Sequence, residues 1–582
     1  MRINKDIVFD LNGYTIDAGN DNTFNNKGKF EIISSAREEV LNGEIVEVEA
    51  AEEGAGTINS LSGDFIVNSG TFRLTSGNLV NKCSAPGGTY NATYNKLINN
   101  NGYFELDGGN ITSVITTNNY NLVNLIYNYE QGKVKITNGN INVKSLYYAI
   151  HNIDTATIEI SGGRFEIGAS YSSSTGMSLI RNESLGVTED VNSEEVNVAV
   201  KINGGEFILT CIHSNVLEHY STERCVINDI TITTSGRAIR NNSTGIIDIF
   251  DGTFNGGTDK NYSLINNDNT GTINIYDGYY SGVIYNHSNG TINISGGEFI
   301  NTEYPIYNYS SGIFNVENAT VTGTTGTAIG NMNVAGQLYV NKSIINGANN
   351  GIHNMGKLTI GNKSEELITD NVETIFLIKG TNNGIYSEGE INYYNGLIQG
   401  GRIVIGTITD IRDGCQVIEE KVDSLINMYL GYTENVAEID GTFYNTLNEA
   451  IEACGIEEKT IKLLKNIIVT QEDTIVIDEN SNIHLDLNNN EIRCMVINGT
   501  VVNSGTLEIY DSSTENLGKL YGCGQQLIDN TGNLNLGSIT LENIIGKNKN
   551  YIRNKEVEYE RVYDLILNDF RNLKLGRITL DR

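Results

Sequence analysis

Hydrophobic residues recur along this chain in short segments that alternate apolar and polar positions. TINI at 272–275 and at 291–294 and TIEI at 157–160 place Ile on one face and polar residues on the other. This period of two predicts β-strands with one buried face. Asp-Gly or Gly-Gly often follows such a strand, and glycine favours the backbone conformations of a tight corner. The motif Ile-x-Asn precedes it, as at 284–286 and 306–308.

The Asn of this motif defines the repeat, which has a period of roughly 19–30 residues in its regular parts. Such a period matches one turn of a solenoid with two or three short strands. The fold class predicted is therefore all-β, a parallel β-helix. An Asn amide both donates and accepts, so stacked amides can satisfy backbone groups inside the turns. We predict a structural Asn column made of Asn26, Asn68, Asn100, Asn128, Asn152, Asn182, Asn241, Asn267, Asn286, Asn308, Asn331, Asn354, Asn503, Asn530, Asn554 and Asn568.

A second regularity shows that the start of one module occurs twice. IHLDLNNNEI at 483–492 matches IVFDLNGYTI at 7–16. Before the second copy, Thr446 and Glu449 form a capping box, and apolar residues with helical spacing predict a short capping helix near 446–454. We expect a β-helix module without its N-terminal cap at 1–400, a terminal coil and connector at 401–440, and the start of a second module at 441–582. Since the first copy lacks the helix, we expect either that the chain is part of a longer protein with neighbouring modules or that partners cover both of its ends.

The residues DGTFYNTLNEAIEACG at 440–455, TIKLLKNIIV at 460–469 and VVNSGTLEIYDSS at 501–513 carry a resemblance. Together with IHLDLNNNEI, they resemble the repeated β-helix modules of large cell-surface, adhesin-like proteins of anaerobic Gram-positive bacteria. The wider fold resembles the pectate-lyase-like right-handed parallel β-helix, so the resemblance implies a right-handed parallel β-helix. The resemblance implies an extracellular or cell-surface location, and it brings no catalytic residue with it. No export signal or anchor motif is visible in the sequence.

Composition narrows the possible partners. The 582 residues carry a formal net charge of -32, which disfavours nucleic acid and anionic membranes as partners. No apolar run reaches the length of a membrane span, so we expect no membrane insertion. The seven Cys are scattered without a CxxC pair, which disfavours a disulfide framework. We expect no cofactor.

The middle residue of Ile-x-Asn should face outward, because side chains alternate along a strand. This outer column combines aromatic, imidazole and guanidinium side chains. Two interpretations are open: the side chains stabilise the sheet as ladders, or they bind a glycan or a surface protein. The candidate binding residues are Tyr127, His151, Arg181, Arg240, Tyr285, Tyr307, His353 and Tyr386.

Motifs for chemistry are sparse. The Asp-Asp, Gly-His-Gly and Arg-Ile-Lys motifs of polygalacturonase-like hydrolases are missing, and Asp410 and Asp413 beside Arg412 are too few for a lyase calcium site. Cys211, His213, His219 and Cys225 contain zinc-ligand residue types, but their spacing fits no zinc pattern, and we expect buried Cys and two surface His.

The function that the sequence favours is a non-enzymatic extracellular β-solenoid, acting as a surface stalk or adhesin. A carbohydrate-active lyase or hydrolase is the alternative, and a phage tail or spike protein is the third possibility.

Overall fold

The computed structural model describes most of the chain. The described residues are 1–19, 23–35, 39–41, 44–46, 54–61, 64–82, 96–114, 124–144, 148–168, 177–191, 194–368, 372–412, 415–432, 435–469, 474–494, 501–513, 518–522, 527–543, 552–554, 573–575 and 578–580. They divide into two compact units. The first comprises Met1–Ile411 and Ile418–Tyr429, and the second comprises Arg412–Val417 and Leu430–Arg582.

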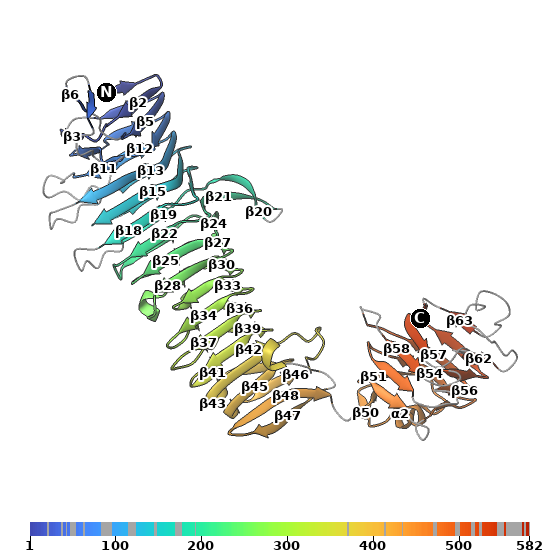
Figure 1. Cartoon of the computed structure of the whole chain (residues 1–582). Helices are drawn as coiled ribbons and strands as arrows, with labels where there is room; N and C mark the ends of the chain where they lie inside the picture. The colour runs from blue at the N-terminus through green and yellow to red at the C-terminus, as the bar shows by residue number, and fades with distance from the viewer. Residues whose placement is uncertain are drawn as a thin grey trace. The chain divides into compact units, whose positions relative to one another are not determined.

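The first unit is a parallel β-helix with three strands in a typical coil, which confirms the predicted fold class (Figure 1). Each strand pairs with the equivalent strand of the next coil, so three parallel sheets run along the stack. The sheet that carries the Asn column, here the Asn sheet, contains β1 (Arg2–Ile3), β4 (Phe24–Asn26), β9 (Ile66–Asn68), β12 (Lys96–Asn100), β14 (Asn124–Asn128), β16 (Tyr148–Asn152), β19 (Met177–Asn182), β23 (Ser214–His219), β26 (Ile239–Asn241), β29 (Ile265–Asn267), β32 (Ile284–Asn286), β35 (Ile306–Asn308), β38 (Ile329–Asn331), β41 (Asn350–Asn354) and the ends of β43 (Leu377–Ser387) and β45 (Leu397–Ile405).

The other two sheets have the same parallel order. The second sheet contains β2 (Ile7–Asp10), β5 (Lys29–Ile33), β10 (Thr71–Leu74), β13 (Tyr103–Val114), β15 (Lys133–Lys144), β17 (Thr157–Ile160), β21 (Glu194–Ile202), β24 (Arg224–Ile227), β27 (Ile246–Ile249), β30 (Thr272–Ile275), β33 (Thr291–Ile294), β36 (Ile313–Glu317), β39 (Gln337–Asn341), β42 (Lys357–Ile360), β44 (Glu390–Tyr393) and β46 (Ile408–Ile411). The third sheet contains β3 (Thr15–Ala18), β8 (Thr57–Ser60), β11 (Asn78–Asn81), β18 (Arg164–Gly168), β22 (Glu206–Leu209), β25 (Ile230–Thr234), β28 (Gly252–Gly256), β31 (Tyr279–Ser281), β34 (Glu298–Asn301), β37 (Thr320–Gly323) and β40 (Ile344–Gly347), together with parts of β13, β15, β43 and β45.

The core consists of like residues stacked from coil to coil. Ile98, Ile126 and Ile150 pair in register and are fully buried. The rings of Phe30 and Phe72 stack with centroids 5.6 Å apart. Each such side chain contributes about 1.5–3 kcal/mol through burial, so the alternating Ile and Phe positions stabilise the coils.

Insertions leave the coils without breaking the sheets. The acidic insertion between the first two Asn of the column contains a hairpin of β6 (Glu39–Leu41) and β7 (Glu44–Val46). The strand β20 (Val187–Val191) pairs antiparallel with β21 and projects beside the stack (Figure 1). Short helical turns occur at η1 (Lys260–Tyr262) and α1 (Val372–Ile375), and β47 (Cys415–Val422) precedes β48 (Leu425–Tyr432), which pairs antiparallel with β45.

The second unit repeats the architecture in a shorter stack. Its three sheets contain β50 (Thr442–Tyr444), β49 (Ala437–Ile439), β51 (Lys459–Leu463), β54 (Asn482–Asp486), β57 (Thr506–Tyr510), β60 (Asn533–Leu536) and β63 (Leu573–Leu575); β52 (Ile467–Val469), β55 (Glu491–Cys494), β58 (Lys519–Gly522), β61 (Ile539–Asn543) and β64 (Ile578–Leu580); and β53 (Ile475–Ile477), β56 (Val501–Asn503), β59 (Ile528–Asn530) and β62 (Ile552–Asn554).

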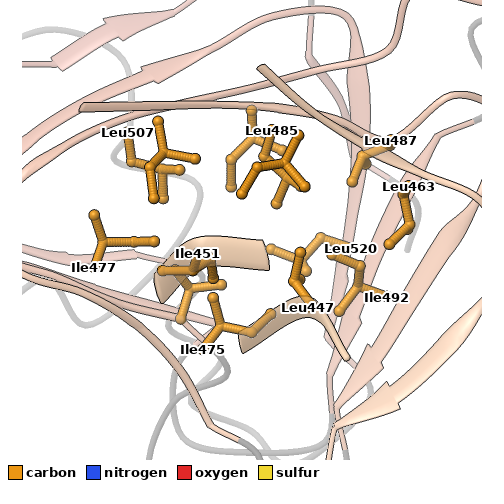
Figure 2. Close-up of a cluster of buried hydrophobic side chains, with 14 of the residues drawn as sticks. Leu447, Ile451, Leu463, Ile475, Ile477, Leu485, Leu487, Ile492, Leu507 and Leu520 are labelled. Carbon is orange, nitrogen blue, oxygen red and sulfur yellow. The ribbon is translucent and has the colours of Figure 1, made fainter. Parts of the chain in front are cut away.

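The predicted capping helix is confirmed as α2 (Leu447–Cys454). The Thr446 hydroxyl accepts a hydrogen bond from the Glu449 backbone N–H, and the Glu449 side chain accepts one from the backbone N–H of Thr446. Leu447 and Ile451 are buried in one cluster with Ile475 of the first coil (Figure 2). The helix therefore covers apolar side chains that would otherwise face solvent at the start of this stack.

Candidate binding face

The Asn column lies inside the coils. Its members in the first unit each end a strand of the Asn sheet and are at most 1% exposed; they are Asn26, Asn68, Asn100, Asn128, Asn152, Asn182, Asn241, Asn267, Asn286, Asn308, Asn331 and Asn354. In the second unit Asn503 and Asn530 are fully buried. Asn554 ends β62 in register with Asn530, and Asn568 lies outside the described residues.

The amide groups of this column bond from coil to coil. The Nδ2 of Asn26 donates to the Oδ1 of Asn68 at 2.7 Å, and equivalent bonds continue as far as Asn182. A second run continues from Asn286 to Asn354, whose amide donates to the hydroxyl of Ser387 at 2.9 Å. The ladder uses the hydrogen-bonding capacity of these amides inside the protein, so it has a structural role.

Close contact between neighbouring coils explains why a Gly follows the Asn by four residues. The Nδ2 of Asn267 donates to the carbonyl of Gly271 at 2.9 Å. A Cβ atom at Gly290, in the next coil, would lie 2.2 Å from the same Nδ2. Only glycine fits beneath the amide, so the Asn and the Gly form one structural motif.

His219 occupies the Asn position of its coil, and this corrects the prediction of a surface histidine. Its side chain is fully buried, 3.1 Å from the amide nitrogen of Asn182, and its Nε2 lies 2.9 Å from the carbonyl of Glu223. Burial lowers the pKa of His219 to about 4 and raises that of the neighbouring Cys225 thiol. The imidazole is therefore neutral at pH 7 and replaces an amide in the ladder.

The remaining candidates for metal binding have other surroundings. His213 packs against the ring of Tyr262, and Cys211 is buried. Asp410 pairs with Lys363, with 3.1 Å between Oδ2 and Nζ, while Asp413 lies outside the described residues. Among the residues that the structure describes, no three His, Cys, Asp or Glu side chains are arranged to hold a metal ion.

The middle residues of Ile-x-Asn form one column on the outer side of the Asn sheet. Strand pairing places them in register in the order Asn99, Tyr127, His151, Arg181, Glu218, Arg240, Asn266, Tyr285, Tyr307, Gly330, His353 and Tyr386. Asn99, Glu218, Asn266 and Gly330 were not among the candidate binding residues. Burial lowers the pKa of His151 and of His353, so both imidazoles are mostly neutral at pH 7.

Two members of this outer column are less accessible than alternation along the strand suggests. Tyr285 is 9% exposed and Tyr307 is 7% exposed, and both belong to a cluster with Val283, Tyr304 and Met332. Residues from neighbouring turns cover their rings, so the pair stabilises the sheet and does not present a free surface. The other predicted members, Tyr127, His151, Arg181, Arg240, His353 and Tyr386, are partly exposed.

A second column lies three residues before the first, and the sequence analysis missed it. This corner column comprises Lys96, Asn124, Tyr148, Ser178, Asn215, Arg237, Ser263, Gly282, Tyr304, Thr327, Asn350 and Asn383. In several pairs of neighbouring coils, strand pairing places consecutive members of this column directly opposite each other, as it does Ser178 and Asn215. Most of these residues are polar although many are buried. In an alignment of the repeats, the recurring polar residue at this position is the signal that could have revealed the column.

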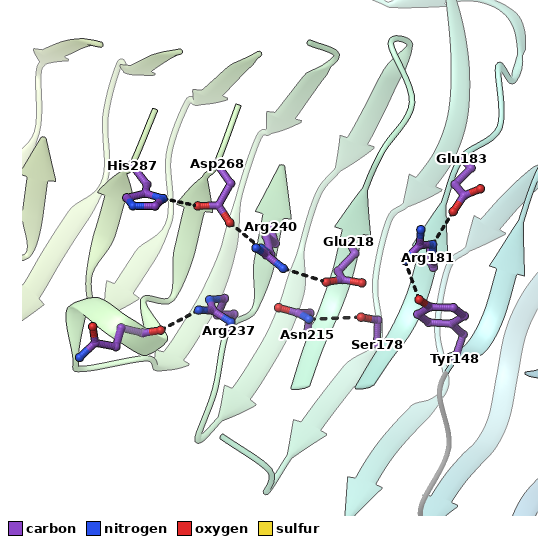
Figure 3. Close-up of polar contacts among 11 residues, drawn as sticks. Tyr148, Ser178, Arg181, Glu183, Asn215, Glu218, Arg237, Arg240, Asp268 and His287 are labelled. Atoms are coloured by element: carbon purple, nitrogen blue, oxygen red, sulfur yellow. Dashed lines mark hydrogen bonds and ion pairs between the residues drawn. The ribbon is translucent and has the colours of Figure 1, made fainter. Parts of the chain in front are cut away.

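Charged side chains of the outer column are linked along the stack (Figure 3). Arg240 lies 3.3 Å from Glu218 and 2.5 Å from Asp268, which in turn contacts His287 at 3.1 Å. Burial by itself lowers the pKa of Arg240. The carboxylates of Asp268 and Glu218 raise it by more, so the pKa of Arg240 is above its ordinary value. Arg181 pairs with Glu183, and its Nη1 donates to the Tyr148 hydroxyl at 2.5 Å. The face is therefore rich in polar groups that pair with one another.

The class of this protein is defined by its fold alone, which is a parallel β-solenoid. No family model, no curated protein and no solved structure matches the chain. A helix long and apolar enough to cross a membrane does not occur among the described residues.

Proposed function

We propose that this chain is a non-enzymatic β-solenoid at the cell surface, whose Asn sheet binds a ligand along its outer face. The observation that carries the proposal is the unbroken register of the outer column from Asn99 to Tyr386. Because coils repeat about every 4.8 Å, partly exposed Tyr, His and Arg side chains form an extended strip. Such side chains are common in binding surfaces.

The scaffold is suited to presenting such a strip. The stacked core residues, and in two runs of coils the Asn ladder, fix the coils against their neighbours, so the side chains of the outer column are held in place before any ligand arrives. A rigid surface loses little conformational entropy on binding. The surface location itself rests on the resemblance of residues 440–513 to adhesin-like modules.

Binding of the purified chain to a glycan microarray and to a panel of extracellular matrix proteins tests this function. Single variants His151→Ser, Arg181→Ser and Tyr386→Ser sample the length of the strip. The control is Tyr279→Ser, because Tyr279 is exposed on the third sheet. We expect at least one variant of the strip to weaken binding tenfold or more while the control binds as the wild type. Equal effects on all four variants, or no bound ligand of any class, would refute the proposal.

A further inference from the structure

The amide ladder inside the first unit is interrupted over three consecutive steps from coil to coil. It reaches His219, whose Nδ1 lies 3.1 Å from the amide nitrogen of Asn182, and it resumes at Asn286. Between these points, Asn241 and Asn267 donate to backbone carbonyls of their own turns at 3.2 and 2.9 Å. Within the described residues, no bond joins one member of the column to the next across these three steps.

The missing ladder bonds leave buried acceptors unpaired. The Oδ1 atoms of Asn267 and Asn286 would each accept from the amide of the preceding coil, and neither has a donor among the described residues. The hydroxyl of Ser263, fully buried just before β29, has no partner in that part of the structure either. Unpaired polar groups in the interior cost stability, so these coils are linked more weakly than the coils on either side.

The backbone pairing and the hydrophobic core continue through the same coils. Leu217, Ile239 and Ile265 pair in register and are fully buried, and the rings of Phe254 and Tyr280 stack with centroids 4.8 Å apart. The coils are therefore folded like the rest of the stack, and the difference lies in their side-chain hydrogen bonds. Because each coil contacts only its neighbours, a weaker link between two coils favours opening at that place alone.

On the outside of the sheet, a chain of charged groups crosses the same three steps (Figure 3). Glu218 of β23 lies 3.3 Å from Arg240 of β26, and Arg240 lies 2.5 Å from Asp268, which follows β29. Asp268 in turn lies 3.1 Å from His287, which follows β32. The side chains of Glu218 and Asp268 are only 8% and 11% exposed. Ion pairs that are shielded in this way depend strongly on both partners, so this chain of charges links the coils where the amide ladder does not.

We infer that the coils of β23, β26 and β29 form a joint in the solenoid, which the outer chain of charges holds closed and which opens before the coils on either side. The joint does not depend on whether this face binds a ligand. Opening divides the first unit into two folded parts and exposes Cys225, which is fully buried with its Sγ 3.2 Å from the Nδ1 of His219. The thiol of Cys225 therefore reports the opening.

Native-state hydrogen–deuterium exchange of the full chain tests the joint directly. We expect peptides that span β23, β26 and β29 to exchange at least tenfold faster than peptides that span β14 and β16 on one side and β35 and β38 on the other. The flanking coils have the same backbone pairing together with an intact ladder, so they are the internal control. Exchange in the joint as slow as in the flanking coils would overturn the inference.

Replacing Arg240 tests the part played by the charges. Arg240→Met breaks the chain at its centre, and the control is Arg164→Met. Arg164 pairs with Glu206 of the next coil, but these two side chains are 46% and 48% exposed, so little depends on their pair. We expect Arg240→Met to raise the rate at which iodoacetamide alkylates Cys225 at least tenfold in native buffer, and Arg164→Met to change it less than twofold. Equal rates in both variants would show that the charges do not hold the joint closed.

A second pair of variants serves if Arg240→Met does not fold. Ser263→Ala deletes the buried hydroxyl that has no described partner in the joint. Ser343→Ala deletes a buried hydroxyl just before β40, where it donates to the Asn341 carbonyl at 2.7 Å. We expect Ser263→Ala to slow the alkylation of Cys225 at least threefold and Ser343→Ala to leave it unchanged while exchange in β40 rises. Alkylation that is as fast or faster in Ser263→Ala than in the wild type would contradict the inference.

Discussion

Replacing one Asn of the ladder tests the structural half of this account. In the first unit Asn331 is fully buried and lies between two other members of the column. Its Oδ1 accepts from Asn308 at 2.9 Å, and its Nδ2 donates to Asn354 Oδ1 at 2.8 Å and to the carbonyl of Gly336 at 3.1 Å. Asn331→Ala removes these three bonds at once, together with a longer one of 3.5 Å from Nδ2 to the Lys357 carbonyl.

The expected loss follows from what remains unpaired. Asn308 keeps a second acceptor, the Gly312 carbonyl at 2.9 Å, and the Gly336 carbonyl keeps the backbone N–H of Lys357. The Oδ1 of Asn354 loses the one hydrogen bond described for it. Two ladder bonds at about 1 kcal/mol each and one stranded acceptor at about 1–2 kcal/mol give a loss of roughly 3–4 kcal/mol.

Hydrogen–deuterium exchange of peptides that span β35, β38 and β41 measures this loss, because each coil contacts only its neighbours and opening is local. The control is Asn382→Ala. It removes an equivalent amide bond, from Asn382 to Asn349 Oδ1 at 2.7 Å, at an exposed position, where we expect a change below about 0.5 kcal/mol. Equal and small effects of both substitutions would refute the structural role of the ladder.

Three further predictions concern stability. Gly290→Ala should lower the urea midpoint of the first unit by the equivalent of about 1–3 kcal/mol, since its Cβ would collide with the amide of Asn267; Gly168→Ala, where the nearest atom is 3.8 Å away, is the tolerated control. Burial holds the pKa of His219 at about 4, below its ordinary 6.5, so the unfolded chain binds this proton more tightly and stability falls as the pH drops from 6.5 toward 4. The loss is about 3 kcal/mol at 1.36 kcal/mol per pKa unit; His219→Asn should remove it, and identical pH profiles would contradict this. Thr446→Ala should cost the second unit about 1 kcal/mol through loss of the helix cap, measured by thermal unfolding, with no effect on exchange in the first unit.

The sequence pattern was sufficient to predict the coil because it depends on local rules. Alternation placed Ile126 and Ile150 inside, and the interval between Asn residues gave the length of each turn. The helix α2 followed from its capping box and apolar spacing, which involve contacts a few residues apart. Such features require no knowledge of how distant segments pack.

The features that were missed depend on neighbouring coils. Alternation places Tyr285 outside, but its exposure depends on Tyr307 and Met332, which come from later coils. His219 differs in residue type from the Asn around it, so only the strand register reveals it as a member of the ladder. The corner column lies across an irregular step in the strands, where a simple period of two gives no prediction.

A crystal structure of the chain with a ligand found in the binding screens tests the central claim most directly. The account predicts electron density for the ligand on the outer face of the Asn sheet, in contact with at least one of His151, Arg181 and Tyr386, which are partly exposed. Density on the second or third sheet, or a ligand bound without contacting any residue of the outer column, would contradict it.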